Sequence, residues 1–487
     1  MFEVTRRVRL AELWRKSGTG AGRGAALAVL GLLACFILSP STGLARPISL
    51  HPENPHYFQW KGQPVVLITS GEHYGALLNL DFDYKAYFKE LESHGLNQTR
   101  TFSGVYRESP KSFKIKNNTL APKPGRYICP WARSDQPGYK NGGNKFDLTK
   151  WDPRYFRRLK DYLREAERRG VVVELVLFCT FYNDTLWGLS PMNAVNNVNG
   201  VGKDVPRTEV CTLKHPDLVK VQERVTRKIV RELKNFDNVY YEVCNEPYFA
   251  GVTEEWQDRI IKTIVETEKD FEHKHLIAKN IANGSKKIKD PNPAVSIFNF
   301  HYAAPPKTVY INYGLDKVIG DDETGFDGSK DVTYRKEGWN FLLAGGALYS
   351  NLDYSFTPDH EDGSATPDAP GGGGESLRRQ LGILKDFMHR FDFVNMRPDN
   401  AVIKGDLPKS VNARALANEG REYAVYIDGG SRVKLGLALP KGDYRAKWIS
   451  TKTGEVMKSE KFSHNGDTRR LASPSYRADI ALAVKRR

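Results

Sequence analysis

Two glutamates in this sequence occupy positions where acid–base chemistry needs carboxyl groups. Glu246 lies in Asn245-Glu246-Pro247, directly after an apolar β-rich run at 239–244, and Glu323 follows a second such run at 317–321. If both runs are strands of one parallel barrel, their carboxyl ends open on the same face, where such barrels place active sites. One carboxylic acid that donates a proton and one carboxylate that attacks carbon or activates water can cleave a glycosidic bond. The alternative for either glutamate alone is a solvated surface charge.

The elements that must position these glutamates form a repeating pattern. Short β-rich runs alternate with amphipathic helical segments, which predicts parallel βαβ units. Eight strands over about 300 residues is the number in a (β/α)₈ TIM barrel. A doubly wound open sheet is the competing topology, but it needs a glycine-rich phosphate turn after its first strand, and residues 70–75 do not form one. The expected strands are 65–70, 96–102, 171–178, 239–244, 276–280, 295–301, 317–321 and 347–354.

The pattern changes on either side of the predicted barrel. Residues 48–66 favour a short strand and a hairpin that could close the barrel floor. Beyond Asn395, short strands recur at intervals of roughly ten residues between Gly, Pro and Asn turns, as in an all-β sandwich. We therefore expect a leader at 1–45, a barrel with its N-terminal hairpin at 46–395, and a small β-sandwich domain at 396–487.

The first 45 residues are typical of an export signal. A basic segment precedes the apolar run 25–37, and Gly43 and Ala45 provide small residues at the −3 and −1 positions of a cleavage site. The run is shorter than the roughly 18 apolar residues of a membrane span. We expect a secreted or periplasmic protein with no membrane span after cleavage. Lipid anchoring at Cys35 is disfavoured because the apolar run continues past it, and Arg6-Arg7 lacks the rest of a twin-arginine signal.

Charge and cysteine content narrow the classes of partner. The formal net charge is +15, and removing residues 1–45, with six Lys/Arg and two acids, leaves +11. These charges are scattered and no nucleic-acid motif is present, so we expect no nucleic-acid partner. The charge permits an acidic glycan without requiring one. The other cysteines form no Cys-x-x-Cys pair, which disfavours zinc and leaves disulfide pairing open; they are Cys129, Cys179, Cys211 and Cys244.

Residues 50–395 resemble clan A glycoside hydrolases, the cellulase-like retaining barrels of the family 5 type. The resemblance rests on Asn245-Glu246 after the fourth strand and Glu323 after the seventh. It implies that Glu246 is the acid/base, that Glu323 is the nucleophile, and that no cofactor or metal is required. It also implies that Arg100 keeps Glu323 ionised. The C-terminal segment is similar to a small sandwich often labelled collagen-binding, a label that by itself predicts no collagen binding here.

The resemblance suggests further site residues. Asn245 would bond a sugar 2-hydroxyl, Tyr302 would hydrogen-bond the nucleophile, and partial desolvation would keep Glu246 protonated. Asp322 is the alternative nucleophile because it immediately precedes Glu323. The family usually offers a Trp from strand eight, whereas this chain offers Tyr354. The remaining candidates for substrate contact are His301 after strand six, Glu72 and His73 after strand one, and the loop aromatics Trp131, Phe181, Tyr182, Trp187 and Tyr248.

These features together predict an exported retaining β-glycoside hydrolase that acts on an oligo- or polysaccharide. Two other functions use the same features. A non-catalytic carbohydrate- or matrix-binding protein could retain the barrel as a scaffold. Binding alone, however, would not require Glu246, Glu323 and Arg100 together. A transglycosylase would use the same residues and exclude water. The sugar, its linkage and the oligomeric state stay open at this stage.

Overall fold

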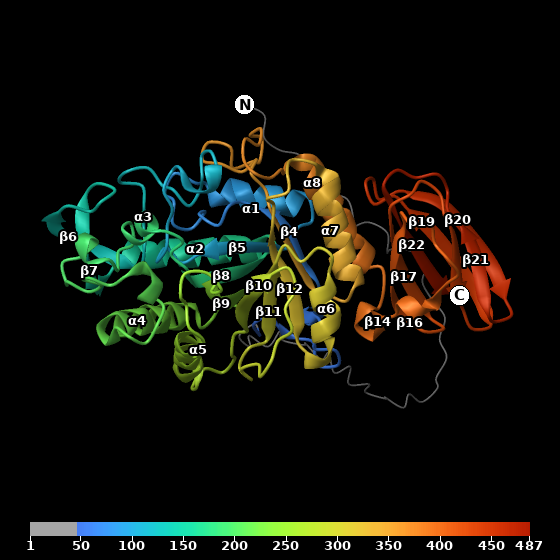
Figure 1. Ribbon diagram of the computed structural model, residues 1–487, viewed down its shortest axis with the longest axis horizontal. Helices are drawn as coiled ribbons and strands as arrows, with labels where there is room; N and C mark the ends of the chain where they lie inside the picture. Colours follow the sequence, from blue (N-terminus) through green and yellow to red (C-terminus); the bar gives the residue numbers. More distant parts are fainter. Residues whose placement is uncertain (1–45) are drawn as a thin grey trace, which may run out of the picture. The chain divides into compact units, whose positions relative to one another are not determined.

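The computed structural model describes residues 46–487 (Figure 1). The predicted leader at 1–45, including Cys35, lies outside the described residues. None of the described helices has the length and apolar character needed to cross a membrane.

A barrel of eight parallel strands forms the centre of the fold, which confirms the predicted fold class (Figure 1). Its hydrogen-bonded order is β4-β13-β12-β11-β10-β9-β8-β5. Strands such as β8 are nearly continuous apolar runs because helices cover the outside and side chains fill the inside, whereas β5, with the sequence QTRTF, is largely polar. Their bounds are β4 Leu67–Gly71, β5 Gln98–Phe102, β8 Val172–Cys179, β9 Val239–Asn245, β10 Ile277–Asn283, β11 Ile297–His301, β12 Val318–Thr324 and β13 Leu348–Leu352.

One side chain joins the two end strands of this order, β4 and β5. Asn97 Oδ1 accepts a hydrogen bond from Ile68 N at 2.9 Å, and its Nδ2 donates to Val66 O at 2.9 Å. The backbone N–H of Asn97 also donates to Ile68 O at 3.2 Å. An amide side chain thus provides both a donor and an acceptor to strand β4, where a regular ladder would use backbone groups.

Helices follow most of the strands and bury one face against the barrel. In α2 the N-cap Asp152 accepts a hydrogen bond from Arg154 N, Pro153 begins the helix, and the apolar face is buried. Between β10 and β11 the described chain forms no helix, so this crossover departs from strict alternation. The helices are α1 Tyr84–Ser93, α2 Pro153–Arg168, α3 Asp184–Trp187, α4 Pro216–Leu233, α5 Glu254–Glu268, α6 Lys307–Asn312, α7 Asp331–Leu343 and α8 Glu375–Met388.

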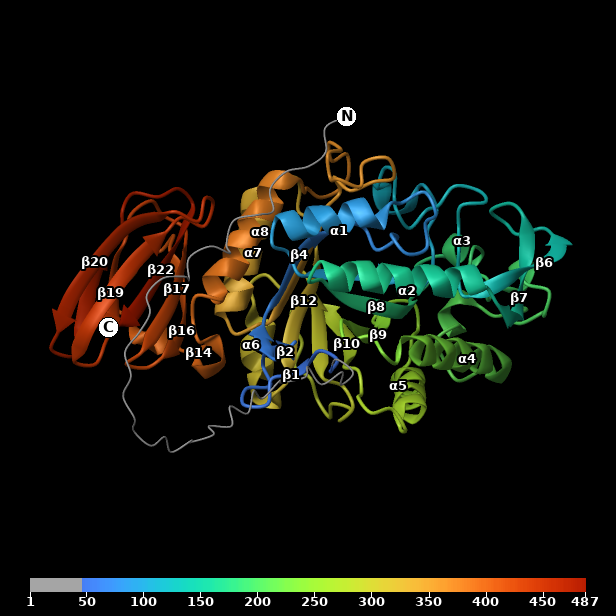
Figure 2. The same ribbon diagram turned by 180° about the vertical axis from the view of Figure 1, so that it is seen from behind.

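Two antiparallel hairpins are added to the barrel. Strands β1 Ser49–Leu50, β2 Phe58–Trp60 and β3 Gln63–Val65 form the first, beside the amino ends of the barrel strands (Figure 2). Ile48 N donates to Asp237 O just before β9, and the buried Phe58 ring lies 6.4 Å from the Tyr240 ring. This is the floor position predicted for the hairpin. The second hairpin, β6 Trp131–Pro137 with β7 Asn144–Trp151, belongs to the long loop after β5.

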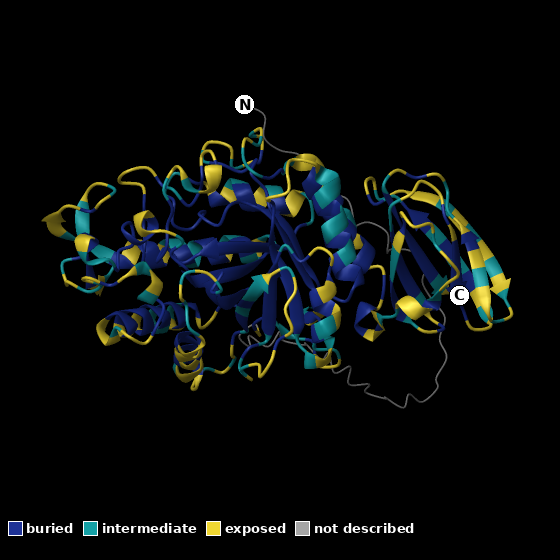
Figure 3. Cartoon of the chain, viewed as in Figure 1, coloured by how far each residue is buried: buried dark blue, intermediate teal, exposed yellow. Residues whose placement is uncertain are grey.

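The C-terminal segment forms two antiparallel sheets, ordered β14-β16-β17-β22-β19-β20 and β15-β18-β21. Alternate residues such as Tyr444 and Trp448 fill a core between exposed outer positions (Figure 3). The strands are β14 Arg397–Pro398, β15 Ile403–Lys404, β16 Asn412–Asn418, β17 Glu422–Asp428, β18 Lys434–Ala438, β19 Gly442–Ile449, β20 Val456–His464, β21 Thr468–Ala472 and β22 Asp479–Arg486.

Helix α7 joins these sheets to the barrel. The Trp339 ring stacks on Tyr426 with centroids 5.4 Å apart, and both residues are buried. Arg335 forms a buried ion pair with Asp479, with Nη2 and Oδ1 separated by 2.6 Å. The contact therefore combines an apolar surface with one desolvated charge pair.

Candidate active site

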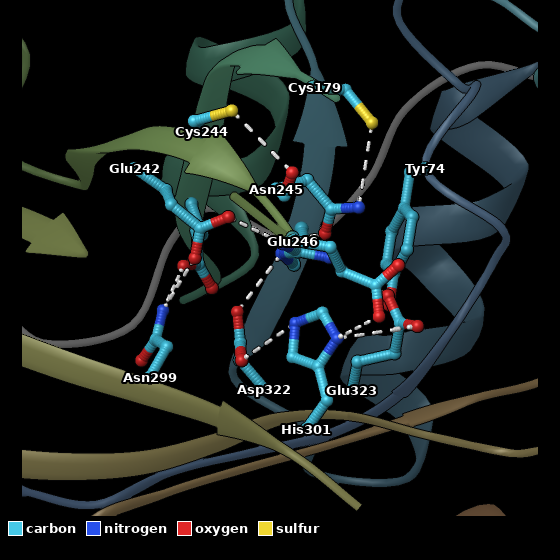
Figure 4. Close-up of polar contacts among 12 residues, drawn as sticks. Tyr74, Cys179, Glu242, Cys244, Asn245, Glu246, Asn299, His301, Asp322 and Glu323 are labelled. Atoms are coloured by element: carbon cyan, nitrogen blue, oxygen red, sulfur yellow. Dashed lines mark hydrogen bonds and ion pairs between the residues drawn. The ribbon is translucent and has the colours of Figure 1, made fainter. Parts of the chain in front are cut away.

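The carboxyl ends of β9, β11 and β12 bring Glu246, His301 and Glu323 together (Figure 4). A carboxylate oxygen of each glutamate and a ring nitrogen of His301 all lie within 4.8 Å of one another. The glutamate side chains retain 10% and 8% exposure, whereas the His301 side chain has none. The two carboxyl groups can therefore reach a bound molecule, and the imidazole lies behind them.

Three donors point at Glu323. Tyr302 donates to Oε1 at 2.6 Å, while Tyr74 and Arg100 donate to Oε2 at 2.9 and 3.2 Å. These hydroxyl and guanidinium donors fix the orientation of the Glu323 carboxyl group. Tyr302 and Arg100 were predicted for this environment, but Tyr74 was not.

A different set of donors surrounds Glu246. Tyr182 donates to Oε2 at 2.5 Å, Tyr248 donates to Oε1 at 3.2 Å, and His301 Nδ1 lies 3.2 Å from Oε1. Burial raises the pKa of Glu246, but the hydrogen bond and the charge of His301 outweigh burial and leave that pKa below its ordinary value. The expectation that desolvation keeps Glu246 protonated is therefore wrong for the unliganded site, because the neighbouring imidazole opposes it.

His301 is surrounded by acidic groups. Its Nδ1 faces Glu246 and Glu323, and its Nε2 lies 3.4 Å from Asp322 Oδ1 on the opposite side of the ring (Figure 4). Burial lowers the pKa of His301, but Glu323, Asp322 and Glu246 together raise it to about 9. The imidazole is thus positively charged at neutral pH and can donate toward either glutamate.

A β-bulge places two consecutive acids of β12 inside the barrel. Phe300 pairs with Asp321, but His301 pairs with Glu323, so Asp322 has no partner in the register. Such a bulge lets neighbouring side chains escape the usual alternation of faces. Asp322 is fully buried, and its Oδ2 lies 3.1 Å from Arg100 Nε. Glu323 and not Asp322 therefore reaches the open end of the barrel, which disfavours Asp322 as nucleophile.

Arg100 and Asn245 lie one layer deeper, beneath the glutamates. Arg100 Nη2 donates to Glu242 Oε1 at 2.5 Å and to Asn245 Oδ1 at 2.6 Å. Asn245 Nδ2 donates to Tyr182 OH at 2.9 Å. Asn245 was predicted to bond a sugar hydroxyl, but its side-chain oxygen and nitrogen are engaged by Arg100 and Tyr182 within the protein. The geometry of Arg100 and Asn245 fits positioning of Glu323 and Tyr182.

The deeper layer contains more acid than Arg100 can neutralise. Asn299 Nδ2 donates to Glu174 at 2.6 Å and to Glu242 at 2.9 Å. Burial and the adjacent Glu242 raise the pKa of Glu174 to about 8, so this carboxyl is largely protonated at neutral pH. A neutral Glu174 reduces the negative charge that Arg100 has to balance.

Cation binding is geometrically feasible at two places. Glu246, His301 and Glu323 form one group of ligand atoms, and Glu174, Glu242 and Asp322 form the other. In the second group Arg100 already provides a positive charge. In the group of Glu246, His301 and Glu323, tyrosine hydroxyls and the Arg100 guanidinium already donate to the glutamate oxygens, and the His301 ring carries a proton. The donor sets therefore favour proton transfer over metal ligation.

Four other residues that were predicted to contact substrate are buried or hydrogen-bonded within the protein instead. Glu72 accepts hydrogen bonds from Gly75 N and Ala76 N, each at 3.0 Å, and so stabilises its own turn. His73 Nδ1 lies 2.8 Å from the side-chain oxygen of Asn118. Trp131 and Trp187 are only 1% and 5% exposed, so neither presents a ring face to a ligand.

Tyr248 and Tyr354 do lie at the site. Tyr248 is half-buried and contacts Glu246 directly. The Tyr354 ring lies 6.2 Å from that of His73, and its buried hydroxyl has no hydrogen-bond partner among residues 46–487.

The four cysteines of the described chain are buried free thiols, and Cys179 and Cys244 lie beside Asn245 (Figure 4).

Three exposed phenylalanines surround the glutamate pair and were not predicted. Phe113, Phe249 and Phe326 are 39%, 43% and 38% exposed. Their rings contact those of the site tyrosines: Phe113 lies 5.1 Å from Tyr182, Phe249 4.9 Å from Tyr248, and Phe326 6.1 Å from Tyr302. Phe249 and Phe326 each follow a site glutamate by three residues, a repetition that was visible in the sequence.

The backbone is strained where it presents this site. Tyr74, Glu246 and Tyr302 adopt left-handed φ angles of 57°, 46° and 53°. Non-glycine residues rarely adopt such angles, which cost roughly 1–3 kcal/mol each and concentrate at functional sites.

No family profile and no curated protein matches the sequence. Solved structures share its fold. A family 5 glycoside hydrolase from Bacteroides vulgatus ATCC 8482 matches with a TM-score of 0.62 and 14% identity over 90% of this chain and 93% of its own. A second protein of that organism, provisionally assigned as a glycoside hydrolase, matches with a TM-score of 0.64 and 16% identity. The match covers 91% of this chain and 83% of that protein. A further glycoside hydrolase matches with a TM-score of 0.60 and 15% identity, over 91% of this chain and 97% of its own.

Proposed function

We propose that this protein is an exported retaining β-glycoside hydrolase with Glu323 as nucleophile and Glu246 as acid/base. The observation that carries the proposal is the glutamate pair, whose nearest oxygens lie within 4.8 Å at the open end of the barrel. Retaining pairs stand about 5–5.5 Å apart, and inverting pairs leave about 6.5–9.5 Å for a water molecule. The spacing of this pair therefore supports double displacement.

The two halves of the reaction use the same atoms. In the first, a Glu323 oxygen bonds to the anomeric carbon, the glycosidic C–O bond breaks, and Glu246 gives its proton to the leaving oxygen. In the second, water attacks the anomeric carbon, Glu246 takes the proton of that water, and the ester bond to Glu323 breaks. Tyr302, Tyr74 and Arg100 hold the carboxylate in place for both steps.

His301 stores the proton that Glu246 needs. In the unliganded site the proton rests on the imidazole, whose Nδ1 faces Glu246 Oε1 at 3.2 Å. A sugar that displaces water from Glu246 makes its ionised form less favourable, and the proton moves along this hydrogen bond to the carboxylate. The acid is thus the Glu246–His301 pair, with one proton shared between them.

The exposed phenylalanines supply surfaces for sugar binding. Apolar ring faces beside a polar catalytic pair are typical of ligand clefts. Phe249 and Phe326 follow the two catalytic strands and so flank the bond to be cleaved, while Phe113 extends the surface from the loop after β5. Replacing Phe249 or Phe326 by Ala should therefore raise KM more than it lowers kcat.

The decisive experiment compares Glu323→Ala and Glu246→Ala on aryl glycosides with good and poor leaving groups. Glu323→Ala should be inactive on both, and azide should restore a product of inverted configuration. Glu246→Ala should slow mainly on poor leaving groups, accumulate the sugar ester on Glu323, and give a retained product with azide. Identical kinetics of the two variants would contradict the assigned roles. Activity unaffected by either change would indicate a non-catalytic binding protein.

A further inference from the structure

A strongly basic groove lies where the six-stranded C-terminal sheet meets Arg390, just after α8, on residues that the proposed reaction does not use. It has a volume of about 590 Å³, and apolar Ile449 and Ala483 form part of its lining. The other residues that line it are all cations: Arg390, Arg445, Lys447, Lys485, Arg486 and Arg487. Six of the 73 Lys and Arg residues of the chain therefore lie together at one place on the surface.

Strand alternation builds this groove. On β19 the side chains of Tyr444 and Trp448 are buried in the sheet core, while the intervening Arg445 and Lys447 lie on the opposite face. The strands next to β19 add further cations to this face, which lies opposite the sheet core. Arg445 pairs in register with Lys485 of β22. The face therefore presents cations along a strand, with alternate residues about 7 Å apart, and across strands about 4.8 Å apart.

The arrangement of these cations is unfavourable for a purely structural sheet. Lys461 of β20 also pairs in register with Arg445, so Lys461, Arg445 and Lys485 form one row across three strands. Like charges directly opposite each other destabilise a sheet. Lys485 is balanced by Glu422 at 2.6 Å. Within residues 46–487, neither Arg445 nor Lys447 forms an ion pair.

We propose that this groove binds a strand of an anionic polysaccharide, a glycan that carries carboxylate or sulfate groups. A row of cations that includes the unpaired Arg445, with the unpaired Lys447 beside it, suits an extended polymer with repeated negative charges, and a single small anion would need a compact cluster instead. The lining contains no aromatic side chain on which nucleic-acid bases could stack.

The groove would keep a polymer attached to the protein while other parts of that polymer visit the barrel. Binding there requires no catalysis, so its test is independent of the proposed hydrolysis. Polygalacturonate tests carboxylate recognition, dextran sulfate tests sulfate recognition, and neutral dextran is the uncharged reference. All are titrated against the full chain at low and high salt, because exposed charge contacts weaken as salt increases.

The variant that tests the groove is Arg445→Glu with Lys447→Glu. Both side chains are partly exposed and make no hydrogen bond or ion pair with the rest of the described chain, so the substitutions remove no polar contact of the sheet. A glutamate at 445 would face Lys461 and Lys485 and would be stabilised by them. The matched control is Lys434→Glu with Arg470→Glu, two exposed cations of the other sheet. Both double variants change the net charge equally.

We expect the wild-type protein to bind at least one anionic polymer and not dextran. The groove variant should bind that polymer about tenfold or more weakly, whereas the control should stay within about twofold. Equal losses in both variants would show that diffuse charge is responsible and would overturn the proposal. Unchanged binding in the groove variant, or tighter binding of a single-stranded oligonucleotide than of either polymer, would overturn it too. Hydrolysis of a small aryl glycoside should be the same in all three proteins.

Discussion

Tyr302 donates the shortest of the three hydrogen bonds to Glu323, at 2.6 Å. A hydrogen bond to a charged group contributes about 1.5–3 kcal/mol, so Tyr302→Phe should lower kcat by about 10- to 100-fold while the fold is retained. The matched control is Tyr241→Phe, because the buried Tyr241 hydroxyl has no hydrogen-bond partner in the described residues and its ring packs against His275. Steady-state kinetics on one aryl glycoside decide the matter, and equal losses in both variants would refute a specific role for Tyr302.

His301 should set the alkaline limit of activity. With its pKa raised to about 9, the imidazolium keeps one proton available to Glu246 until the pH passes that value. The alkaline limb of kcat/KM should therefore fall near pH 9 in the wild type. In His301→Asn the proton would rest on a carboxyl group alone, and the limb should move to lower pH with a rate loss of about 10²-fold or more. An alkaline limb at the same pH in both proteins would exclude proton storage on His301.

At the scale of elements, closure of the barrel depends on Asn97 between β4 and β5. Asn97→Ala leaves Ile68 N and Val66 O without these partners. Each unpaired buried group costs about 1–3 kcal/mol, so the free energy of unfolding should fall by about 2 to 6 kcal/mol. Denaturant unfolding measures this change. Asn395→Ala, at an exposed asparagine, serves as the control and should change the free energy of unfolding by less than about 0.5 kcal/mol. Similar values for both would mean that Asn97 does not join the strands.

At the scale of the whole molecule, the Arg335–Asp479 pair couples the barrel to the C-terminal sheets. Asp479→Asn leaves a buried guanidinium without its charge partner and should lower the free energy of unfolding by about 3 kcal/mol. Activity on a small substrate should persist, because every residue placed at the glutamate pair lies between positions 72 and 354. Lys336 pairs with Asp428 on a more exposed part of the same contact, so Asp428→Asn should cost less than about 1 kcal/mol. Lost activity without lost stability would contradict a purely structural coupling.

The sequence by itself determined the elements and the main chemical groups. Several barrel strands, such as β8, are apolar runs, and helix α2 shows its N-cap Asp152 and first-turn Pro153 in the sequence, because these signals depend on neighbouring residues. The end-of-strand rule then places Glu246, His301 and Glu323 on one face. Local patterns were sufficient for the fold class and for the glutamate pair, since both follow from where strands end.

Only the tertiary structure decided how those groups interact. The bulge that turns Asp322 inward, the burial of Trp131 and Trp187, and the proton on His301 all depend on side chains from distant strands and loops. The basic groove likewise forms only when separate strands align in register. Desolvation, charge coupling and packing act through space, so residues far apart in the sequence fix them together, and no local pattern records the result.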